Sequence, residues 1–257
     1  MSREPERVFV QSLERGLAVM RVFSRERPSV TLSEAAAVAD VTRATARRIL
    51  LTLQQLGYVR SDGRRFVPTP RMLDIGYAYL ASLDLWAAAE PCMTELAELT
   101  RESSSAATLD GDDLVYVARV PSRRVMTIAL SVGSRLPAYP TSMGRVLLAE
   151  LEPCDLDAYL DRVRPRQLTP CTVTDRAKLR ERIDAAREQG WCIVDQELES
   201  GIRSIAAPVR DQHGSAIAAL NIGGHAGRVT VEQLREEFLP PLLDAARQIG
   251  HAAAARR

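Results

Sequence analysis

The chain has 257 residues, of which 46% are hydrophobic and 26% charged, and its formal net charge is +1. This composition is typical of a folded globular protein, and the length favours two domains over one. The N-terminal segment has no apolar signal region, and no stretch approaches the roughly 20 apolar residues that a membrane helix needs. We therefore expect a cytoplasmic protein without a membrane partner.

The four cysteines are scattered along the chain and form no CxxC pair; they are Cys92, Cys154, Cys171 and Cys192. Zinc sites and disulfide frameworks both require cysteines at characteristic spacings. The sequence therefore predicts no metal site and no disulfide framework, and nothing in it indicates a cofactor.

The small net charge conceals an uneven distribution. Residues 1–70 hold 12 arginines and 7 acidic residues, whereas the rest of the chain holds 22 basic and 26 acidic residues. A positive region attracts the phosphate backbone of nucleic acids. Any contact with nucleic acid is therefore expected in the N-terminal 70 residues.

The first predicted element is a helix over about residues 12–24. Leu13, Leu17 and Met20 recur at helical spacing, with Val22 or Phe23 beyond them. We expect this face to close a three-helix core.

Residues 31–67 contain two short amphipathic helical patterns and then a basic hairpin pattern with a glycine at its tip. The two apolar faces consist of Leu32, Ala35, Ala36 and Ala39, and of Ala46, Ile49, Leu50 and Leu53. Asp40 falls at the turn, where Asp tolerates a left-handed backbone, and Thr42 is the predicted N-cap of the second helix. This order of elements predicts a winged helix-turn-helix.

The second of these helices leaves polar residues off its apolar face. We predict that the following residues contact double-stranded DNA: Thr42, Arg43, Ala44, Thr45, Arg47 and Arg48 on the helix, and Arg64 and Arg65 beside the wing turn. The first turns of a recognition helix enter the major groove, and a wing suits the backbone or the minor groove. The alternative is a small helical hairpin with a solvated basic face.

An apolar helical pattern follows the wing and predicts a linker helix. Its hydrophobic residues include Met72, Leu73, Ile75, Tyr77 and Tyr79, more than a solvated linker would carry. We expect this helix to pack against a partner subunit. The predicted organisation is a DNA-binding domain over residues 1–69, a linker helix over 70–84 and a second domain over 85–257.

The second domain mixes strand and helix patterns. Strands are predicted at 105–109, 114–120, 125–131, 192–198, 202–209 and 216–222, and helices at 86–102, 142–151, 155–162, 175–189 and 230–254. Hairpin signals at 110–112 and 211–214 join neighbouring strands. The predicted fold class is α/β (α+β), with an antiparallel or mixed sheet and packed helices forming a sensor-like domain.

Three stretches add a resemblance to these elements: RLPAYPTSMGRVLLAEL at 135–151, DQELESGIRSIAAPVRD at 195–211 and AALNIGGHAGRVT at 218–230. With the winged helix-turn-helix and the linker helix, they resemble the IclR family of transcriptional regulators over essentially the whole chain. YVARVPSRRVM at 116–126 and VPTPRMLDIGYAYL at 67–80 are similar to its β-ketoadipate-pathway branch, which controls the catabolism of protocatechuate and related aromatic acids.

The resemblance implies a GAF-like effector domain and ligand-controlled repression or activation of genes. It also implies a homodimer or tetramer bound to a palindromic operator. Effector binding would then shift the population of assemblies toward or away from the geometry that fits two half-sites.

The resemblance also implies a pocket for a small organic acid. The positions that match the family's pocket are Val125, Ile128, Leu136, Ser142, Met143, Asp195, Ile202, Ser204, Asn221 and Gly223. A helix N-terminus at Thr141 and Ser142 would suit a carboxylate, and Ser204 and Asn221 a second polar end.

A dicarboxylate would need a cationic partner as well. Candidates are Arg119, Arg123, Arg124, Arg135, Arg145 and Arg203. Strand alternation points Arg203 away from Ile202 and Ser204, and we favour Arg123 or Arg124. The chain departs from the family pattern at Tyr139-Pro140, where many members have His, and at Arg145, where Lys is usual.

Two other functions are compatible with parts of the sequence. A hydrolase could pair Cys192 or Ser204 with His225 and Asp195, although no GxSxG motif supports it. A ligand-independent architectural DNA binder would need only the first 70 residues, and the large second domain argues against it. We expect no catalytic residues.

Overall fold

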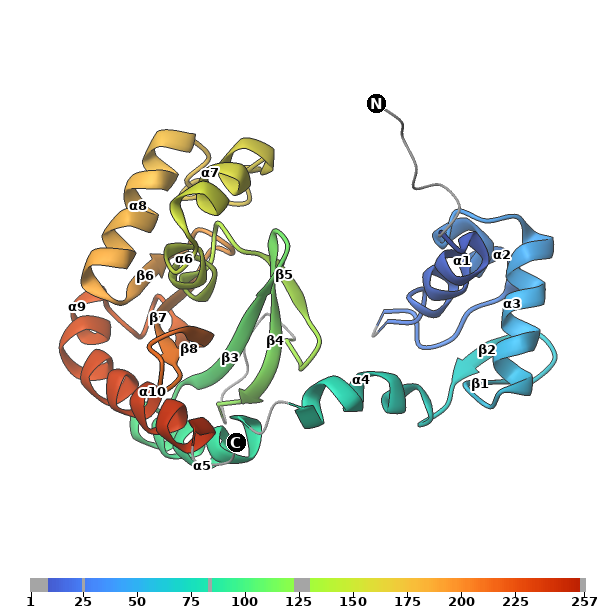
Figure 1. Cartoon of the computed structure of the whole chain (residues 1–257), viewed down its shortest axis with the longest axis horizontal. Helices are drawn as coiled ribbons and strands as arrows, with labels where there is room; N and C mark the ends of the chain where they lie inside the picture. Colours follow the sequence, from blue (N-terminus) through green and yellow to red (C-terminus); the bar gives the residue numbers. More distant parts are fainter. Residues whose placement is uncertain (1–8, 25, 83–84, 123–129, 255–257) are drawn as a thin grey trace. The chain divides into compact units, whose positions relative to one another are not determined.

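The computed structural model describes residues 9–24, 26–82, 85–122 and 130–254 (Figure 1). The chain divides into two compact units, Met1–Ser82 and Leu83–Arg257, and the linker helix belongs to the first. No helix in the described ranges is long and apolar enough to cross a membrane.

The first unit contains α1 (Gln11–Met20), α2 (Leu32–Val38), α3 (Arg43–Gln55), β1 (Val59–Ser61), β2 (Phe66–Pro68) and α4 (Met72–Ser82). Strands β1 and β2 pair antiparallel as the predicted wing. The predicted stripes of α2 and α3 face the core, with Ala35, Ala36, Ala46, Leu50 and Leu53 buried. The helix-turn-helix and its wing are therefore confirmed.

Local side-chain contacts explain where these helices begin. Thr31 and Glu34 form a reciprocal capping box at the start of α2. Asp40 adopts φ 49° at the turn, and the Thr42 side chain accepts a hydrogen bond from the Thr45 amide. Both predictions for this turn are confirmed.

The predicted packing of the first helix is confirmed for Met20, Val22 and Phe23 but is wrong for Leu13 and Leu17. The side chains of Leu13 and Leu17 are 61% and 41% exposed, whereas Val19 and Val22 are fully buried. Helix α1 ends at Met20 and reaches the core only with its last turn and the residues that follow. Its first turns therefore leave an apolar surface uncovered within this chain.

The second unit contains a six-stranded sheet in the order β5-β4-β3-β8-β7-β6, and every neighbouring pair is antiparallel. The strands are β3 (Ser103–Asp110), β4 (Asp113–Val120), β5 (Arg135–Pro137), β6 (Cys192–Asp195), β7 (Ile202–Arg210) and β8 (Ala216–His225). Strand β5 lies in a stretch for which we predicted no strand. Residues 125–129 of the strand predicted at 125–131 lie outside the described residues.

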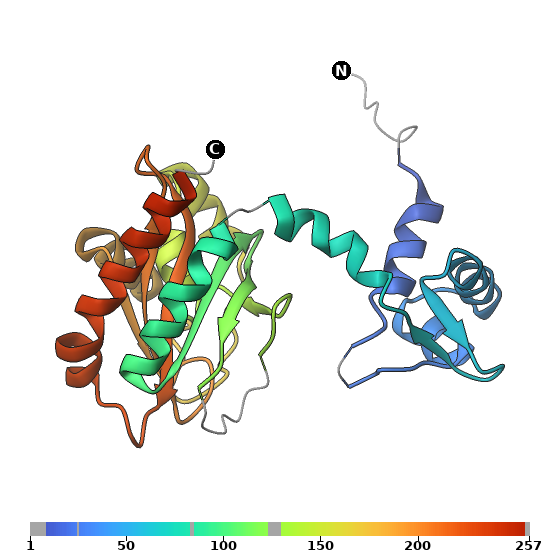
Figure 2. The ribbon, with the colours of Figure 1, turned by 90° about the horizontal axis from the view of Figure 1, so that it is seen from below.

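Helices cover both faces of this sheet (Figures 1 and 2). Helices α6 (Ser142–Ala149), α7 (Pro153–Arg162) and α8 (Arg176–Gln189) pack on one face. Helices α5 (Leu85–Thr100) and α10 (Leu239–Ala254) lie side by side on the other. Each face carries its own apolar core, so the sheet is the middle of three layers.

The helix predicted at 230–254 is three consecutive segments. They are α9 (Val231–Gln233), a π-helical turn η1 (Leu234–Phe238) and α10. Pro240 and Pro241 have no amide hydrogen, so the usual α-helical bonds to residues 236 and 237 cannot form. The wider turn accommodates this loss just before the prolines.

Candidate DNA-binding surface and effector pocket

Helix α3 presents its arginines to solvent. Arg43, Arg47 and Arg48 are exposed, and no acidic side chain pairs with them in the described part of the chain. Thr42 and Ala44 are exposed beside them. Thr45 is half-buried, and its Oγ1 lies 2.9 Å from Thr42 Oγ1. The arginines are thus available to phosphates or base edges, while Thr42 and Thr45 fix the start of the helix.

The wing turn separates its two arginines. Asp62 Oδ1 accepts hydrogen bonds from the amides of Arg64 and Arg65 at 2.9 and 2.8 Å, and these bonds lower the pKa of Asp62. Gly63 adopts φ 92°, which a side chain would disfavour. Arg64 is exposed. Arg65 instead turns toward the protein, where its guanidinium contacts Ser29 and Glu34.

The sheet of the second unit brings polar groups together on one face. Cross-strand register places Ser105 between Arg119 and Asn221. A second row joins Gly223, Ser204 and Val194 across β8, β7 and β6. Directly opposed residues of neighbouring strands point to the same face, so both rows line one pocket.

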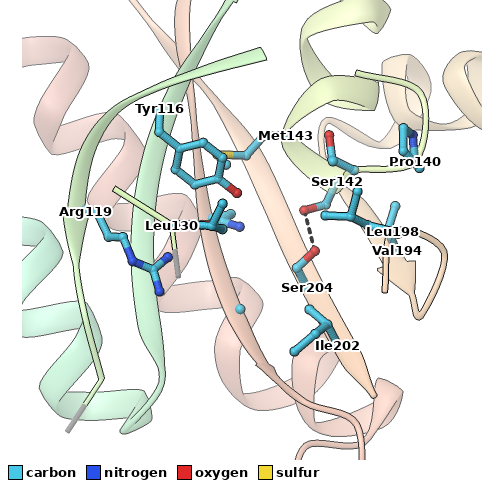
Figure 3. A pocket seen from close by; sticks show the side chains of 13 residues that line it. Tyr116, Arg119, Leu130, Pro140, Ser142, Met143, Val194, Leu198, Ile202 and Ser204 are labelled. Carbon is cyan, nitrogen blue, oxygen red and sulfur yellow. Dashed lines mark hydrogen bonds between the residues drawn. The ribbon is translucent and has the colours of Figure 1, made fainter. Parts of the chain in front are cut away.

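A bulge directs Arg119 into this pocket. The register between β3 and β4 shifts so that Ala106 opposes Ala118 while Ala107 opposes Tyr116, which leaves Val117 as an extra residue. Without the bulge, strand alternation would place Tyr116 and Arg119 on opposite faces. With it, both line the pocket (Figure 3). Arg119 Nη1 donates to Ser105 Oγ at 3.1 Å.

Helix α6 closes the pocket from above the sheet. Thr141 caps it by accepting from the Gly144 amide at 3.0 Å, and Ser142 Oγ lies 2.8 Å from Ser204 Oγ on β7 (Figure 3). A Cβ on Gly144 would lie 2.0 Å from the carbonyl oxygen of Ala138. Glycine therefore allows the helix to begin against the preceding loop.

The pocket has apolar walls and few charges. Its lining residues are Tyr116, Arg119, Leu130, Pro140, Thr141, Ser142, Met143, Val194, Leu198, Ile202, Ser204, Asn221 and Gly223. Arg119 is the one ionised side chain among these described residues. Burial raises the pKa of Tyr116 to about 12, so its phenol stays neutral, and burial also lowers the pKa of Arg119.

Six of the predicted pocket residues line this cavity: Ser142, Met143, Ile202, Ser204, Asn221 and Gly223. Leu136 and Asp195 do not. Leu136 packs against the core on the α6 side, and Asp195 opposes Arg203 across β6 and β7, one residue out of phase with Val194. Val125, Ile128, Arg123 and Arg124 lie outside the described residues.

The other candidate arginines are engaged elsewhere. Arg203 donates to both carboxylate oxygens of Asp195 at 2.8 Å, as strand alternation predicts, and Arg135 pairs with Asp110 and Asp113 at the surface. Arg119 was among the candidates for the cationic partner, but we favoured Arg123 or Arg124. Tyr116 and Val194 line the pocket and were not predicted to do so. Val194 faces the pocket because it pairs with Ser204 across β6 and β7, and neither this register nor the bulge in β4 has a signal in the sequence.

Arg145 lies behind the pocket and forms a buried ion pair. Its side chain is 2% exposed, and its Nη1 donates to Glu197 Oε1 at 2.7 Å. Arg145 Nε also donates to the carbonyl of Tyr139 at 3.0 Å, and Glu197 accepts from the amide of Val173. The pair holds α6, the loop before it and the loop after β6 together.

Two family models cover both units. The model described as "IclR helix-turn-helix domain" matches residues 12–63, and that described as "Bacterial transcriptional regulator IclR C-terminal" matches residues 77–251. The chain belongs to the IclR family. It is a DNA-binding transcriptional regulator rather than an enzyme or an architectural DNA binder.

Individual relatives extend over nearly the whole of this IclR-family chain. The Pca regulon regulatory protein of Pseudomonas putida is 44% identical over 244 residues, which are 95% of this chain and 84% of that protein. A transcriptional regulator of Rhodococcus sp. RHA1 is 49% identical with a TM-score of 0.87, covering 97% of this chain and 100% of that one. An IclR homolog of Microbacterium hydrocarbonoxydans, complexed with 4-hydroxybenzoate, is 25% identical with a TM-score of 0.84, covering 94% and 98%.

The geometry of this IclR-family regulator also lacks the proposed hydrolytic triad. Asp195 is bonded to Arg203, and Ser204 to Ser142. His225 Nδ1 accepts from the Gly227 amide, and burial raises the pKa of Cys192 to about 11. No group of three or more metal-ligating side chains occurs within the described ranges.

Proposed function

We propose that this regulator controls genes of aromatic-acid catabolism and that its effector is a small aromatic acid. The observation that carries the proposal is a single cation, Arg119, in an otherwise uncharged and largely apolar pocket of the described residues. Such a pocket favours a flat apolar body with one carboxylate. The 4-hydroxybenzoate bound to one relative, and the Pca regulon controlled by another, support this choice.

In the proposed complex, the carboxylate binds Arg119 because a charge-assisted hydrogen bond offsets the loss of water best. The ring lies among the apolar groups of Met143, Val194 and Ile202. A second polar group of the acid binds Ser142 at the start of α6 and Ser204 on β7, beside Asn221 and Gly223.

Calorimetric titration tests the charge requirement. The full-length protein is titrated with 4-hydroxybenzoate, protocatechuate and the uncharged 4-hydroxybenzyl alcohol. Arg119→Met should weaken binding of the acids at least about tenfold, because a buried carboxylate loses its cationic partner. The alcohol should bind both proteins equally weakly.

The matched control is Arg135→Met, which removes an arginine from the same sheet outside the pocket. It should bind the acids like the wild type. Equal affinity of the wild type and Arg119→Met for the acids would refute the assignment of Arg119. A protein that binds none of the acids would refute the effector class.

We also propose that two copies associate through α4 and bind a palindromic operator. Leu73, Ile75 and Tyr77 on this helix are 72%, 51% and 68% exposed. Leu73 and Tyr77 lie one turn apart on the same face of the helix, and exposed apolar surface of this kind marks an interface between proteins. A symmetric pair of helix-turn-helix units would then match two inverted half-sites.

Sedimentation of Leu73→Glu and of Val38→Glu measures the oligomeric state of each variant. The pair tests whether association depends on α4 in particular rather than on any exposed apolar residue. Val38 is 43% exposed on α2, outside the proposed interface. Leu73→Glu should shift the assembly toward monomer and weaken operator binding, whereas Val38→Glu should remain associated. An unchanged assembly in Leu73→Glu would exclude α4 as the contact.

A further inference from the structure

Arg65 differs from Arg64 and from the arginines of α3, because its half-buried guanidinium is bonded to the body of the unit. Its Nε donates to Ser29 Oγ at 2.8 Å, and its Nη2 donates to the Ser29 carbonyl at 2.9 Å. The same Nη2 lies 3.1 Å from Glu34 Oε2. Three acceptors therefore converge on one side chain.

These acceptors belong to the segment that leads into α2 and to its first turn. Glu34 Oε2 also accepts from the Thr31 amide at 2.7 Å, which closes the capping box of α2. These hydrogen bonds, together with the charge of Arg65, lower the pKa of Glu34. One carboxylate thus fixes both the start of α2 and the side chain of a wing residue.

The wing has a second anchor directly beside this contact. Val30 and Phe66 exchange two backbone hydrogen bonds, at 3.0 and 2.8 Å. Phe66 and Val30 are buried, so this anchor holds the base of the wing. Arg65 is the next residue toward the tip and the last one with a contact to the helical body.

We propose that Arg65 is a positioning residue that sets the angle of the wing, and that Arg64 at its tip makes the phosphate contact. The Asp62 bonds to both amides fix the turn, from which Arg64 faces solvent while the contacts with Ser29 and Glu34 hold Arg65 toward α2. Glu34 takes part in DNA binding through Arg65, although its own charge repels phosphate.

The salt dependence of DNA binding distinguishes a positioning arginine from a contacting one. Each phosphate contact contributes a slope of about −0.9 to a plot of log affinity against log salt. Binding of the full-length protein to a duplex from the promoter beside its own gene is measured at several salt concentrations. Arg64→Met should reduce the slope by about one contact.

Arg65→Lys should weaken binding about 3- to 10-fold with the slope unchanged. Lysine keeps the positive charge but cannot reach Ser29 and Glu34 with the planar donor geometry of arginine. A direct phosphate contact would survive this substitution, because lysine also binds phosphate. Wild-type affinity in Arg65→Lys, together with a reduced slope in Arg65→Met, would overturn the proposal.

Glu34→Gln gives the sharpest result, because the two possible roles of Glu34 predict opposite changes in DNA affinity. Glutamine can still accept from the Thr31 amide, so the cap of α2 is retained. If Glu34 affects DNA only by repelling its phosphates, removal of the negative charge should tighten DNA binding. If Glu34 instead holds Arg65 in place, the same substitution should weaken DNA binding. Glu14→Gln, an exposed acid on α1, is the control and should not weaken binding.

The double variant Glu34→Gln, Arg65→Lys completes the test. Residues that act through one contact have non-additive effects, so the double variant should bind about as well as Arg65→Lys alone. Thermal unfolding of each variant checks that the unit remains folded. Additive losses, or tighter binding by Glu34→Gln, would show that the two residues act separately.

Discussion

The two units place their functional arginines in opposite environments. Arg43 and Arg47 are exposed on a helix surface, where a guanidinium keeps its water until DNA displaces it. Arg119 and Arg145 lie inside the sensor unit, where loss of water must be offset by fixed partners. The first unit therefore needs only a surface of the right shape and charge, while the second depends on the register of its sheet.

The largest expected effect comes from the buried ion pair. Arg145→Met should lower the free energy of unfolding of the sensor unit by about 3 to 5 kcal/mol, because Glu197 would remain buried without its partner. Urea denaturation followed by tryptophan fluorescence measures the loss, since both tryptophans belong to this unit. The double variant Arg145→Met, Glu197→Met should recover part of it. A loss below about 1 kcal/mol in the single variant would show that water reaches the pair.

Gly144→Ala should lower the free energy of unfolding by at least about 1 to 3 kcal/mol, because the added methyl group would clash with the backbone of Ala138. The same denaturation experiment measures it, and effector affinity should fall as α6 shifts. Gly16→Ala on α1 is the matched control from the first unit, whose unfolding is followed by circular dichroism because both tryptophans lie in the second unit. No atom lies within 4 Å of a Cβ there, so alanine should stabilise by about 0.5 to 1 kcal/mol. Equal effects at both positions would contradict the difference in packing.

Ionisation of the buried phenol of Tyr116 should destabilise the folded protein at alkaline pH. The pKa of Tyr116 is about 12 in the folded protein, against 10 for an ordinary tyrosine, so its stabilising contribution is complete below pH 10 and is lost as the pH rises to 12. The wild type should lose about 2 to 3 kcal/mol more than Tyr116→Phe over this range. Denaturation at each pH measures the difference. Parallel pH profiles of the two proteins would mean that the phenol is solvated.

At the exposed surface the expected effects are smaller. Arg43→Ala or Arg47→Ala should weaken specific DNA binding by about 1 to 3 kcal/mol if the lost contact is bidentate to a base. Gel shifts on the promoter duplex measure this, and the unfolding midpoint should not change. Arg247→Ala, at an exposed arginine of the second unit, is the control. Unchanged affinity in both α3 variants would exclude this face of the helix from DNA contact.

Local rules predicted the first unit well because its elements are short and adjacent in sequence. The stripes of α2 and α3, the left-handed Asp40 and the Thr42 cap all depend on residues within one or two turns. The packing of α1 was the exception. Met20 of its apolar stripe packs against this unit's core, whereas Leu13 and Leu17 line an open groove beside α3, and periodicity alone does not show what covers an apolar face.

The sensor pocket was only partly predictable. Family resemblance indicated Ser142, Ser204 and Asn221, which the structure brings together in one pocket. The register between β6 and β7 places Asp195 opposite Arg203, on the face away from the pocket, and the sequence alone does not give that register. Arg65 was predicted as a DNA contact because arginines beside a wing turn usually face the groove, and its partners are about 30 residues away in the sequence.

By itself, the sequence determined the winged helix-turn-helix, the uneven charge, the alternation of most strands and the kind of regulator. The first three depend on composition and spacing along the chain, whereas the kind of regulator followed from the family resemblance. The tertiary structure decided which arginine enters the pocket, because a single extra residue at Val117 reverses the phase of β4. It also decided that Arg65 faces inward. Both outcomes depend on contacts between distant segments, and such contacts leave no period in the sequence.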